Sequence, residues 1–281
     1  MIAGLVAALA LPAGTITAMQ GSASAQEAQP LQYVALGDSV AAGIGAGSPT
    51  ANSVDGCWAD ASHTVRVTNS RLAYPRRVAS ALGAQLDFRA FCGANVRLTR
   101  TQQAQTLNAG TDLVTVQVGA NDFGYADVLS FCYLWNPPRT SDCNRRINEI
   151  ANKFATELPG RLNQLYRTIK KKAPNAKVVV VGYPQIVKPQ STLFCYGDGA
   201  LPTSTHQALN RAGNALNSVL AARAAAHGFT FVDPRPSFQG HEVCGDPEWV
   251  NGVSSPKVES FHPNATGQEA LGWLVWQAVK P

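Results

Sequence analysis

The sequence predicts an α/β fold in which helices cover both faces of a parallel β-sheet. Apolar, β-prone runs alternate with helix-like stretches along most of the chain. The run Lys177 to Gly182 is continuously apolar after its first residue, which is typical of a strand buried on both faces. A length of 281 residues fits one large domain and requires no second one.

Five runs are expected to form strands. They are Leu31 to Leu36, Gln85 to Phe91, Leu113 to Val118, Lys177 to Gly182 and Thr230 to Asp233. Helices are expected near 74–82 and over 147–169, 206–227 and 266–280, with Pro159-Gly160 kinking or dividing the second of these. The passage 124–144 is expected to be a loop closed by a disulfide.

Residues 1–25 are interpreted as a secretory signal peptide. An apolar run from Ile2 to Leu11 precedes Ala23-Ser24-Ala25, a small-x-small cleavage site. The run is shorter than the ~20 apolar residues of a membrane-spanning helix. No Lys or Arg stands ahead of it, which departs from the usual pattern. We therefore expect a secreted, extracellular protein whose single domain spans residues 26–281.

The composition excludes several classes of protein. An apolar content of 45% and a charged content of 15% describe a globular chain and exclude a disordered one. The formal charge of +5 is mild, and the basic residues are scattered apart from Lys170-Lys171-Lys172. Because nucleic-acid binding needs a basic stripe with interleaved aromatic residues, no nucleic-acid partner is expected.

Six cysteines follow the export signal, and an even number favours a fully paired set. They are Cys57, Cys92, Cys132, Cys143, Cys195 and Cys244. Fifteen pairings are possible for six cysteines. Pairing them in sequence order, 57 with 92, 132 with 143 and 195 with 244, keeps each loop local. A reactive cysteine nucleophile is the alternative, although a fully paired set leaves no thiol over.

Candidate catalytic groups stand where strands end. Ser39, Gly93 and Asn121 follow the first three strands, and His262 stands just before the final helix. The carboxyl ends of parallel strands meet at one edge of a sheet, where such folds bind ligands. A serine hydroxyl needs a base to remove its proton, and acyl transfer needs donors for the oxyanion. Ser39 would attack an ester carbonyl while His262 removes its proton.

The other residues have supporting roles in this chemistry. Glu259 would accept the second imidazole N–H and hold the tautomer of His262. The backbone N–H groups of Ser39 and Gly93 and the side-chain amide of Asn121 would form the oxyanion hole. Asp38 and Asp122 are expected to tie loops together by accepting backbone N–H bonds.

Four blocks of the chain resemble those of the SGNH (GDSL-type) hydrolase family. They are Gly37-Asp38-Ser39, then Gly93, then Gly119-Ala120-Asn121-Asp122, and last Glu259-Ser260-Phe261-His262. The resemblance covers nearly all of the mature chain, and the ordered cysteine pairs resemble those of secreted actinobacterial esterases, lipases and phospholipases. It implies a flavodoxin-like three-layer α/β/α sandwich with a central five-stranded parallel sheet and disulfide-stapled loops. It also implies that the protein needs no metal and no cofactor.

Two positions depart from the family pattern. Val40 replaces the usual leucine after the serine, a conservative apolar change. Glu259 replaces the usual aspartate, and its extra methylene can place the carboxylate differently. Some family members are thought to orient the histidine with a backbone carbonyl instead. Both means of orienting His262 therefore stay open.

The identity of the ester is left open. The long loops carry aromatic residues that suggest an apolar cleft and favour lipid or aryl esters: Trp58, Tyr125, Phe131, Tyr133, Trp135, Phe194, Tyr196, Phe238 and Trp249. Phospholipase A activity and carbohydrate deacetylation are alternatives. A non-catalytic lipid- or glycan-binding protein is the other class, although it would be expected to have lost Ser39 or His262. We expect a monomer whose partners are an ester or lipid substrate and, transiently, a lipid surface.

Overall fold

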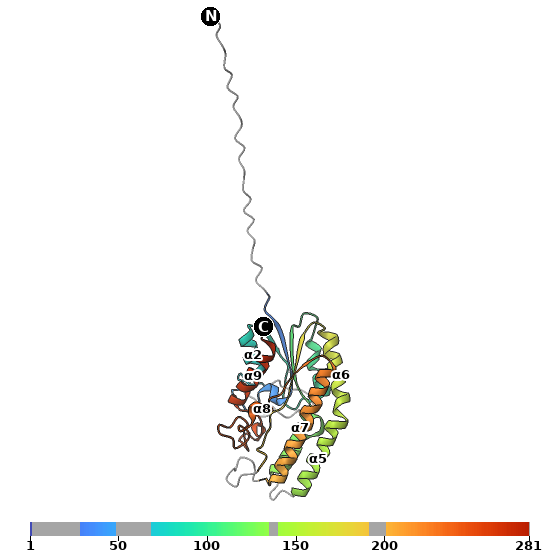
Figure 1. Cartoon of the computed structure of the whole chain (residues 1–281), viewed down its shortest axis with the longest axis vertical. Helices are drawn as coiled ribbons and strands as arrows, with labels where there is room; N and C mark the ends of the chain where they lie inside the picture. The colour runs from blue at the N-terminus through green and yellow to red at the C-terminus, as the bar shows by residue number, and fades with distance from the viewer. Residues whose placement is uncertain (2–28, 49–68, 135–139, 191–200, 281) are drawn as a thin grey trace.

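A single parallel sheet forms the centre of the computed structural model, which describes residue 1 and residues 29–48, 69–134, 140–190 and 201–280 (Figure 1). The strand order is β2-β1-β3-β4-β5, and every neighbouring pair is parallel. The strands are β1 (Gln32–Gly37), β2 (Gln85–Phe88), β3 (Leu113–Gln117), β4 (Lys177–Val181) and β5 (Thr230–Val232). The predicted five-stranded parallel sheet is confirmed. This order reverses direction between β1 and β3, which is where doubly wound sheets bind their ligands.

Burial follows the position of each strand in the sheet. Every residue of the central strand β3 is buried, whereas the edge strands β2 and β5 are partly exposed. Tyr33 on β1 pairs in register with Leu113 on β3. The Tyr33 hydroxyl shares a hydrogen bond of 2.8 Å with Thr115 Oγ1. The centre of the sheet is therefore a rigid base for the loops that follow β1 and β3.

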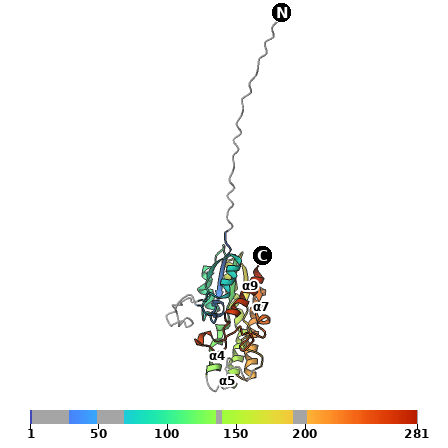
Figure 2. The same ribbon diagram turned by 90° about the vertical axis from the view of Figure 1, so that its left-hand side faces the viewer.

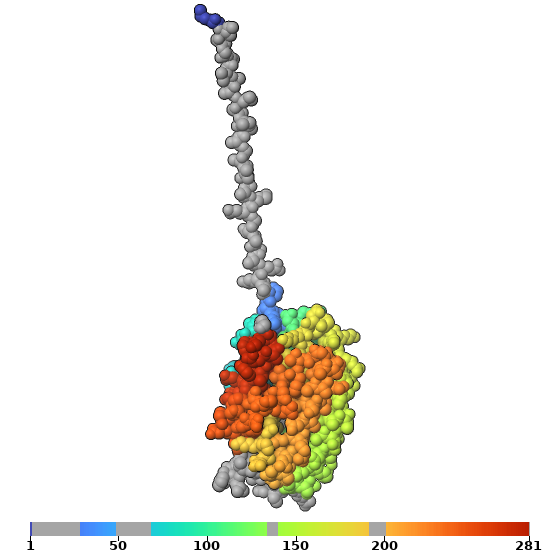
Figure 3. Space-filling model, in the orientation of Figure 1, coloured from blue at the N-terminus to red at the C-terminus, as the bar shows by residue number. Residues whose placement is uncertain are grey.

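Helices lie on both sides of the strands. They are α1 (Ser39–Ala42), α2 (Tyr74–Leu82), α3 (Val96–Thr101), α4 (Tyr125–Leu134), α5 (Thr140–Thr156), α6 (Leu158–Lys172), α7 (Thr203–Ala226), α8 (Arg235–Phe238) and α9 (Ala265–Val279). Short 3₁₀ turns are η1 (Gln103–Thr106), η2 (Ala120–Phe123) and η4 (Lys257–Glu259). In Figure 1, α2 and α9 lie on one side of the strands and α5, α6 and α7 on the other. Figure 3 shows α7 on the surface between α9 and the α5–α6 pair.

The expectation of a loop over 124–144 is wrong in its described part. Residues 125–134 form α4, and α5 begins at Thr140. Tyr125, Val128, Leu129 and Cys132 are all buried, and their three- and four-residue spacing is that of a helix face. The expected division at Pro159 is confirmed, because α5 ends at Thr156 and Pro159 lies in the first turn of α6.

A disulfide between Cys132 and Cys143 joins α4 to α5, with the two Cα atoms 5.5 Å apart. Figure 2 shows both helices at the end of the molecule opposite the C-terminus. Cys92 and Cys244 are disulfide-bonded too, and no cysteine in the described part is free. Their expected partners, Cys57 and Cys195, lie outside the described residues.

Candidate active site

The turn that carries Ser39 begins where β1 ends. Asp38 is the N-cap of α1, and its Oδ1 accepts a hydrogen bond of 3.0 Å from the Val40 N–H. A Cβ on Gly37 would lie 2.6 Å from both the Ala41 Cβ and the Gln117 carbonyl oxygen. Only glycine fits there, so the chain can turn sharply out of the sheet. Ser39 is 8% exposed at the start of α1.

His262 contacts Ser39, although the two residues lie near opposite ends of the sequence. Its Nε2 lies 2.7 Å from Ser39 Oγ, although the two residues are 223 positions apart. Its other ring nitrogen, Nδ1, lies 3.0 Å from the Ser260 carbonyl oxygen. A carbonyl can only accept a hydrogen bond, so Nδ1 carries the proton and Nε2 is free to accept one. Burial lowers the pKa of His262 to about 4, which keeps the imidazole neutral at pH 7.

The expectation that the Glu259 carboxylate orients His262 is not met by this geometry. The Ser260 carbonyl occupies that role, and within the described residues no hydrogen bond or ion pair joins the Glu259 side chain to the imidazole. The reason is local: η4 ends at Glu259, and residues 259–262 form a turn instead of continuing a helix. The carbonyl alternative, left open by the sequence, is the one that the structure has.

The turn over 259–262 has the dihedral angles of a type II turn. Ser260 has φ −59° and ψ 137°, and Phe261 has a positive φ of 62°. The His262 N–H donates to the Glu259 carbonyl at 3.3 Å, which closes the turn. A positive φ is strained for a bulky residue, by roughly 1–3 kcal/mol. The ring of Phe261 packs on that of Tyr133 with 4.1 Å between centroids, which helps to hold this conformation.

Two backbone N–H groups near the candidate nucleophile have no acceptor in the described structure. Within those residues, neither the Ser39 N–H nor the Gly93 N–H donates a hydrogen bond. Gly93 has a φ of 76° in a turn that the Ala94 N–H closes on the Phe91 carbonyl at 3.3 Å. Asn121 lies in η2, and its Nδ2 donates to the Ala94 carbonyl at 3.0 Å. That bond holds the loop after β3 against the loop after β2.

Asp38 and Asp122 tie loops together, as expected. Asp122 accepts hydrogen bonds from the Val96 N–H at 2.9 Å and from Arg161 at 3.0 Å. Burial raises the pKa of Asp122. Asp38 accepts from the hydroxyl of Tyr183 as well as from Val40, and burial raises its pKa to about 7. Both carboxylates are thus engaged with groups of the scaffold and serve to hold the loops around the site.

The sequence patterns did not reveal a set of buried carboxamides around the nucleophile turn. Gln103 grips Gly37 at two points, since Oε1 accepts from the Gly37 N–H at 2.8 Å and Nε2 donates to the Gly37 carbonyl at 2.9 Å. Gln268 of α9 accepts from the Tyr74 N–H at 2.9 Å and donates to the Val40 carbonyl at 2.8 Å. Polar residues on otherwise apolar helix faces are the signal that could have revealed them.

The aromatic residues expected to line a cleft do not form one group in the described structure. Tyr125 and Phe238 are buried in the core, and Trp249 stacks on the imidazole of His241 at 3.8 Å. Four of the nine lie outside the part of the chain whose structure is described: Trp58, Trp135, Phe194 and Tyr196. No three His, Cys, Asp or Glu side chains in the described ranges are grouped so that they could hold a metal ion.

Comparison with known proteins shows similarity along almost the entire chain. The sequence model of the GDSL-like Lipase/Acylhydrolase family matches residues 35–270. Lipase 1 of Streptomyces coelicolor is 40% identical over 97% of this chain and 96% of its own length. The lipase of Streptomyces rimosus is 36% identical over 95% of this chain and 93% of its own.

Two solved structures are similar in both fold and sequence. Phospholipase A1 from Streptomyces albidoflavus NA297 has a TM-score of 0.78 and 36% identity, covering 90% of this chain and all of that one. The extracellular lipase from Streptomyces rimosus has a TM-score of 0.76 and 35% identity, covering 89% of this chain and all of that one.

Proposed function

This chain belongs to the GDSL-like lipase/acylhydrolase family, and we propose from that premise that Ser39 and His262 carry out its ester hydrolysis. The protein is a carboxylic ester hydrolase, since its full-length relatives are lipases. The observation that carries the residue assignment is the 2.7 Å contact between His262 Nε2 and Ser39 Oγ. This is the hydrogen bond that a serine nucleophile needs with its general base.

The proposed reaction has two halves. Ser39 Oγ bonds to the ester carbonyl carbon while its proton moves to His262 Nε2. The tetrahedral intermediate then expels the alcohol, which takes that proton, and leaves an acyl group on Ser39. A water molecule then bonds to the acyl carbon while His262 Nε2 removes its proton. The second tetrahedral intermediate breaks its bond to Ser39 Oγ, which takes that proton, and the carboxylic acid is released. The Ser260 carbonyl holds the Nδ1–H throughout, so Nε2 always faces the reacting oxygen.

The oxyanion is assigned to three donors: the N–H groups of Ser39 and Gly93 and the side-chain amide of Asn121. The N–H groups of Ser39 and Gly93 support this assignment, because neither donates a hydrogen bond within the described residues and each can donate to a ligand; Ser39 is buried and Gly93 is exposed. Nδ2 of Asn121 has a second hydrogen beside the one given to Ala94. Removing one such donor typically lowers kcat by ~10²–10³.

The proposed substrate is a lipid ester or an aryl ester. Phospholipase A activity, which hydrolyses an acyl ester bond of a phospholipid, is the second candidate. It is favoured by the similarity to the phospholipase A1 of Streptomyces albidoflavus. Carbohydrate acetyl esters would use the same residues. The first candidate, a lipid or aryl ester, and the second, a phospholipid, differ in the acyl chain and in the headgroup. Part of the expected cleft wall belongs to loops outside the described ranges.

Several properties of the whole protein belong to the same proposal. Residues 1–25 would be a signal peptide and 26–281 one domain, with the mature protein secreted as a monomer that meets lipid surfaces transiently. Similarity to the extracellular lipase of Streptomyces rimosus supports secretion. In the described ranges, no helix has the length and hydropathy needed to cross a membrane. The helices on the two sides of the sheet support a three-layer, flavodoxin-like sandwich, with the cysteines paired in sequence order.

Hydrolysis of p-nitrophenyl esters from acetate to palmitate tests the assignment. Ser39→Ala and His262→Ala are each expected to lower kcat at least about 10⁴-fold without changing the circular dichroism spectrum. Ser80→Ala, at an exposed serine of α2, is the matched control and should leave the rate unchanged. Full activity in Ser39→Ala would refute the mechanism. A rate that rises toward long chains would favour lipids, and release of fatty acid from phosphatidylcholine would favour the phospholipase.

A further inference from the structure

The hydroxyl of Tyr183 joins two loops that carry the proposed catalytic groups. It donates a hydrogen bond to Asp38 Oδ2, and Asp38 directly precedes Ser39. The same oxygen accepts a hydrogen bond of 3.5 Å from the Ala120 N–H, and Ala120 directly precedes Asn121. One phenolic oxygen therefore bridges the loop after β1 and the loop after β3. These are the two sides of the point at which the strand order reverses.

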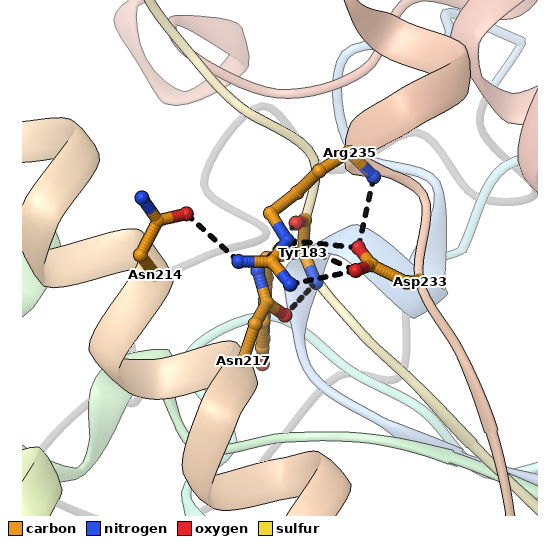
Figure 4. Close-up of polar contacts among 5 residues, drawn as sticks. All are labelled: Tyr183, Asn214, Asn217, Asp233 and Arg235. Carbon is orange, nitrogen blue, oxygen red and sulfur yellow. Dashed lines mark hydrogen bonds and ion pairs between the residues drawn. The ribbon is translucent and has the colours of Figure 1, made fainter.

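The position of Tyr183 is itself fixed by a buried amide. Asn217 on α7 accepts from the Tyr183 N–H at 2.8 Å and donates to the Tyr183 carbonyl at 2.9 Å (Figure 4). Asn217 is 1% exposed, so this two-point grip is shielded from competing water. A Cβ on Gly182 would lie 2.6 Å from Asn217 Oδ1, which explains why glycine precedes the tyrosine.

A second contact secures the neighbouring chain. Arg235 bonds the Asp233 carboxylate through Nε at 2.9 Å and donates to Asn214 Oδ1 at 2.8 Å (Figure 4). Asn214 lies one helical turn before Asn217 on α7. The helix that grips Tyr183 is thus held to the chain that follows β5.

We propose that Tyr183 is a positioning residue of the ester-hydrolysing site, whose hydroxyl sets the turn bearing Ser39 relative to the loop bearing Asn121. This inference rests on the proposed function. Tyr183 is 8% exposed, and its hydroxyl is bonded on both sides to protein groups. It acts through Asp38 and Ala120 and does not bind the ester. Displacing an oxyanion donor by about 1 Å can cost ~10²-fold in rate, so a lost bridge has a large effect on turnover.

The burial of Asp38 is a further reason why the Tyr183 hydroxyl affects the turn that bears Ser39. Asp38 is buried, and burial raises its pKa to about 7, while the hydrogen bond from Tyr183 lowers it. The charged carboxylate is the form that best caps the Val40 N–H. Without the Tyr183 hydroxyl, Asp38 would lose its strongest side-chain donor in a site from which water is excluded.

The test compares Tyr183→Phe with Tyr166→Phe. Tyr166 is buried too, but its hydroxyl has no hydrogen-bond partner among the described residues, so its loss controls for removing a buried phenol. Rates are measured on a soluble p-nitrophenyl ester and divided by the number of sites that an organophosphate titrates. Tyr183→Phe is expected to lower kcat at least about tenfold with KM within about twofold, and Tyr166→Phe to change neither. A kcat for Tyr183→Phe within twofold of the parent enzyme would overturn the inference.

A double-mutant cycle tests whether the loss of kcat in Tyr183→Phe depends on the hydrogen bond to Asp38. In an Asp38→Asn background the cap on Val40 is kept and the carboxylate is removed. Tyr183→Phe should then cost less than about threefold in kcat, because the partner of the hydroxyl has already changed. An undiminished tenfold loss would contradict the path through Asp38.

Two further results separate the inference from the proposed function. Activity that survives Ser39→Ala refutes the proposed function, whereas Ser39-dependent activity with a normal Tyr183→Phe refutes the positioning role alone. If Tyr183→Phe does not fold, Asn217→Asp provides the second variant, since it keeps the acceptor for the Tyr183 N–H and loses the donor to its carbonyl. It too should lower kcat and spare KM, and an unchanged kcat would refute the inference.

Discussion

The carbonyl of Ser260, a neutral group, orients His262, and its neutrality affects the pKa of the imidazole. A carboxylate beside the imidazole would favour the protonated ring and raise its pKa, whereas a carbonyl supplies only a dipole. Burial then dominates and lowers the pKa of His262 to about 4. The imidazole is therefore neutral over a wide range of pH, and in the proposed reaction the imidazolium depends on the developing charges of the intermediate for stabilisation.

The pH dependence of kcat/KM should reveal this low pKa. Protonated His262 cannot accept the Ser39 proton, so activity is present above the pKa and lost as the pH falls through about 4. We expect kcat/KM for a soluble ester to be nearly constant from neutral pH down to about pH 5 in an Asp38→Asn variant, which lacks the buried carboxyl group whose pKa is raised to about 7. The rate should be measured by separating the products, since nitrophenol absorbs weakly in acid. An acid limb centred near the ordinary histidine pKa of ~6.5 would contradict the buried, carbonyl-held imidazole.

Substituting Glu259 separates the carbonyl from the carboxylate. Because Nδ1 is bonded to the Ser260 carbonyl, Glu259→Gln is expected to leave kcat within about twofold of the parent value. Glu157→Gln, which removes an exposed carboxylate between α5 and α6, is the control for the loss of a surface charge. A loss of tenfold or more in Glu259→Gln alone would restore the carboxylate to the catalytic group.

At the scale of elements, the short turns between strands and helices do most of the positioning. The turn from β1 into α1 needs glycine at position 37 because backbone and side chain crowd that site. The turn before α9 tolerates Phe261 at positive φ, where the ring contact with Tyr133 offsets the strain. One turn thus depends on the absence of a side chain and the other on the presence of a large one.

Two glycine substitutions should have opposite effects on stability. Gly37→Ala places a Cβ 2.6 Å from the Ala41 Cβ and from the Gln117 oxygen, so it should lower the free energy of unfolding by about 1–3 kcal/mol. Gly160→Ala, inside α6 with no atom near its Cβ, should raise it by about 0.5–1 kcal/mol. Urea unfolding followed by circular dichroism measures both. Equal effects of the same sign would show that crowding does not control position 37.

At the scale of the molecule, one side chain joins the last helix to α1 and α2. Gln268 of α9 joins the Val40 carbonyl, 228 positions away, to the Tyr74 N–H at the start of α2. Gln268 is fully buried, and the Tyr74 N–H depends on it for its hydrogen bond, whereas the Val40 carbonyl also accepts from the Gly43 N–H at 3.1 Å. This single side chain connects the proposed nucleophile, the helix pair on one side of the sheet and the segment that follows His262.

Removing that connection should destabilise the whole fold. Gln268→Leu keeps the volume but leaves the buried Tyr74 N–H unpaired and removes one of the two donors to the Val40 carbonyl, and we expect a loss of about 1–3 kcal/mol in the free energy of unfolding. Gln164→Leu, at an exposed position of α6, should change stability by less than about 0.5 kcal/mol. Thermal and urea unfolding of the two variants provide the comparison, and equal stabilities would contradict the role assigned to Gln268.

The outline of the fold could be predicted from the sequence because strands and turns have local sequence signals. The Val run of β4 and the Gly-Asp-Ser break after β1 identify the sheet and its functional edge. The spacing of Glu259 and His262 left both the carboxylate and a backbone carbonyl open as partners of the imidazole, because the type II turn between them could not be read from the residue types. Tyr183, Asn217 and Gln268 were not recognised, since their roles depend on partners far away in the sequence.

The distance in sequence between Ser39 and His262 has a consequence for how the protein is made. The chain is synthesised from its N-terminus, so the proposed nucleophile emerges 223 residues ahead of its base. A nascent chain that stops short of residue 262 contains the serine, the glycine and the asparagine but has nothing to remove the serine proton. On the proposed mechanism, ester hydrolysis therefore requires synthesis through residue 262, after the residues of all five strands, and a partly made chain would not hydrolyse esters.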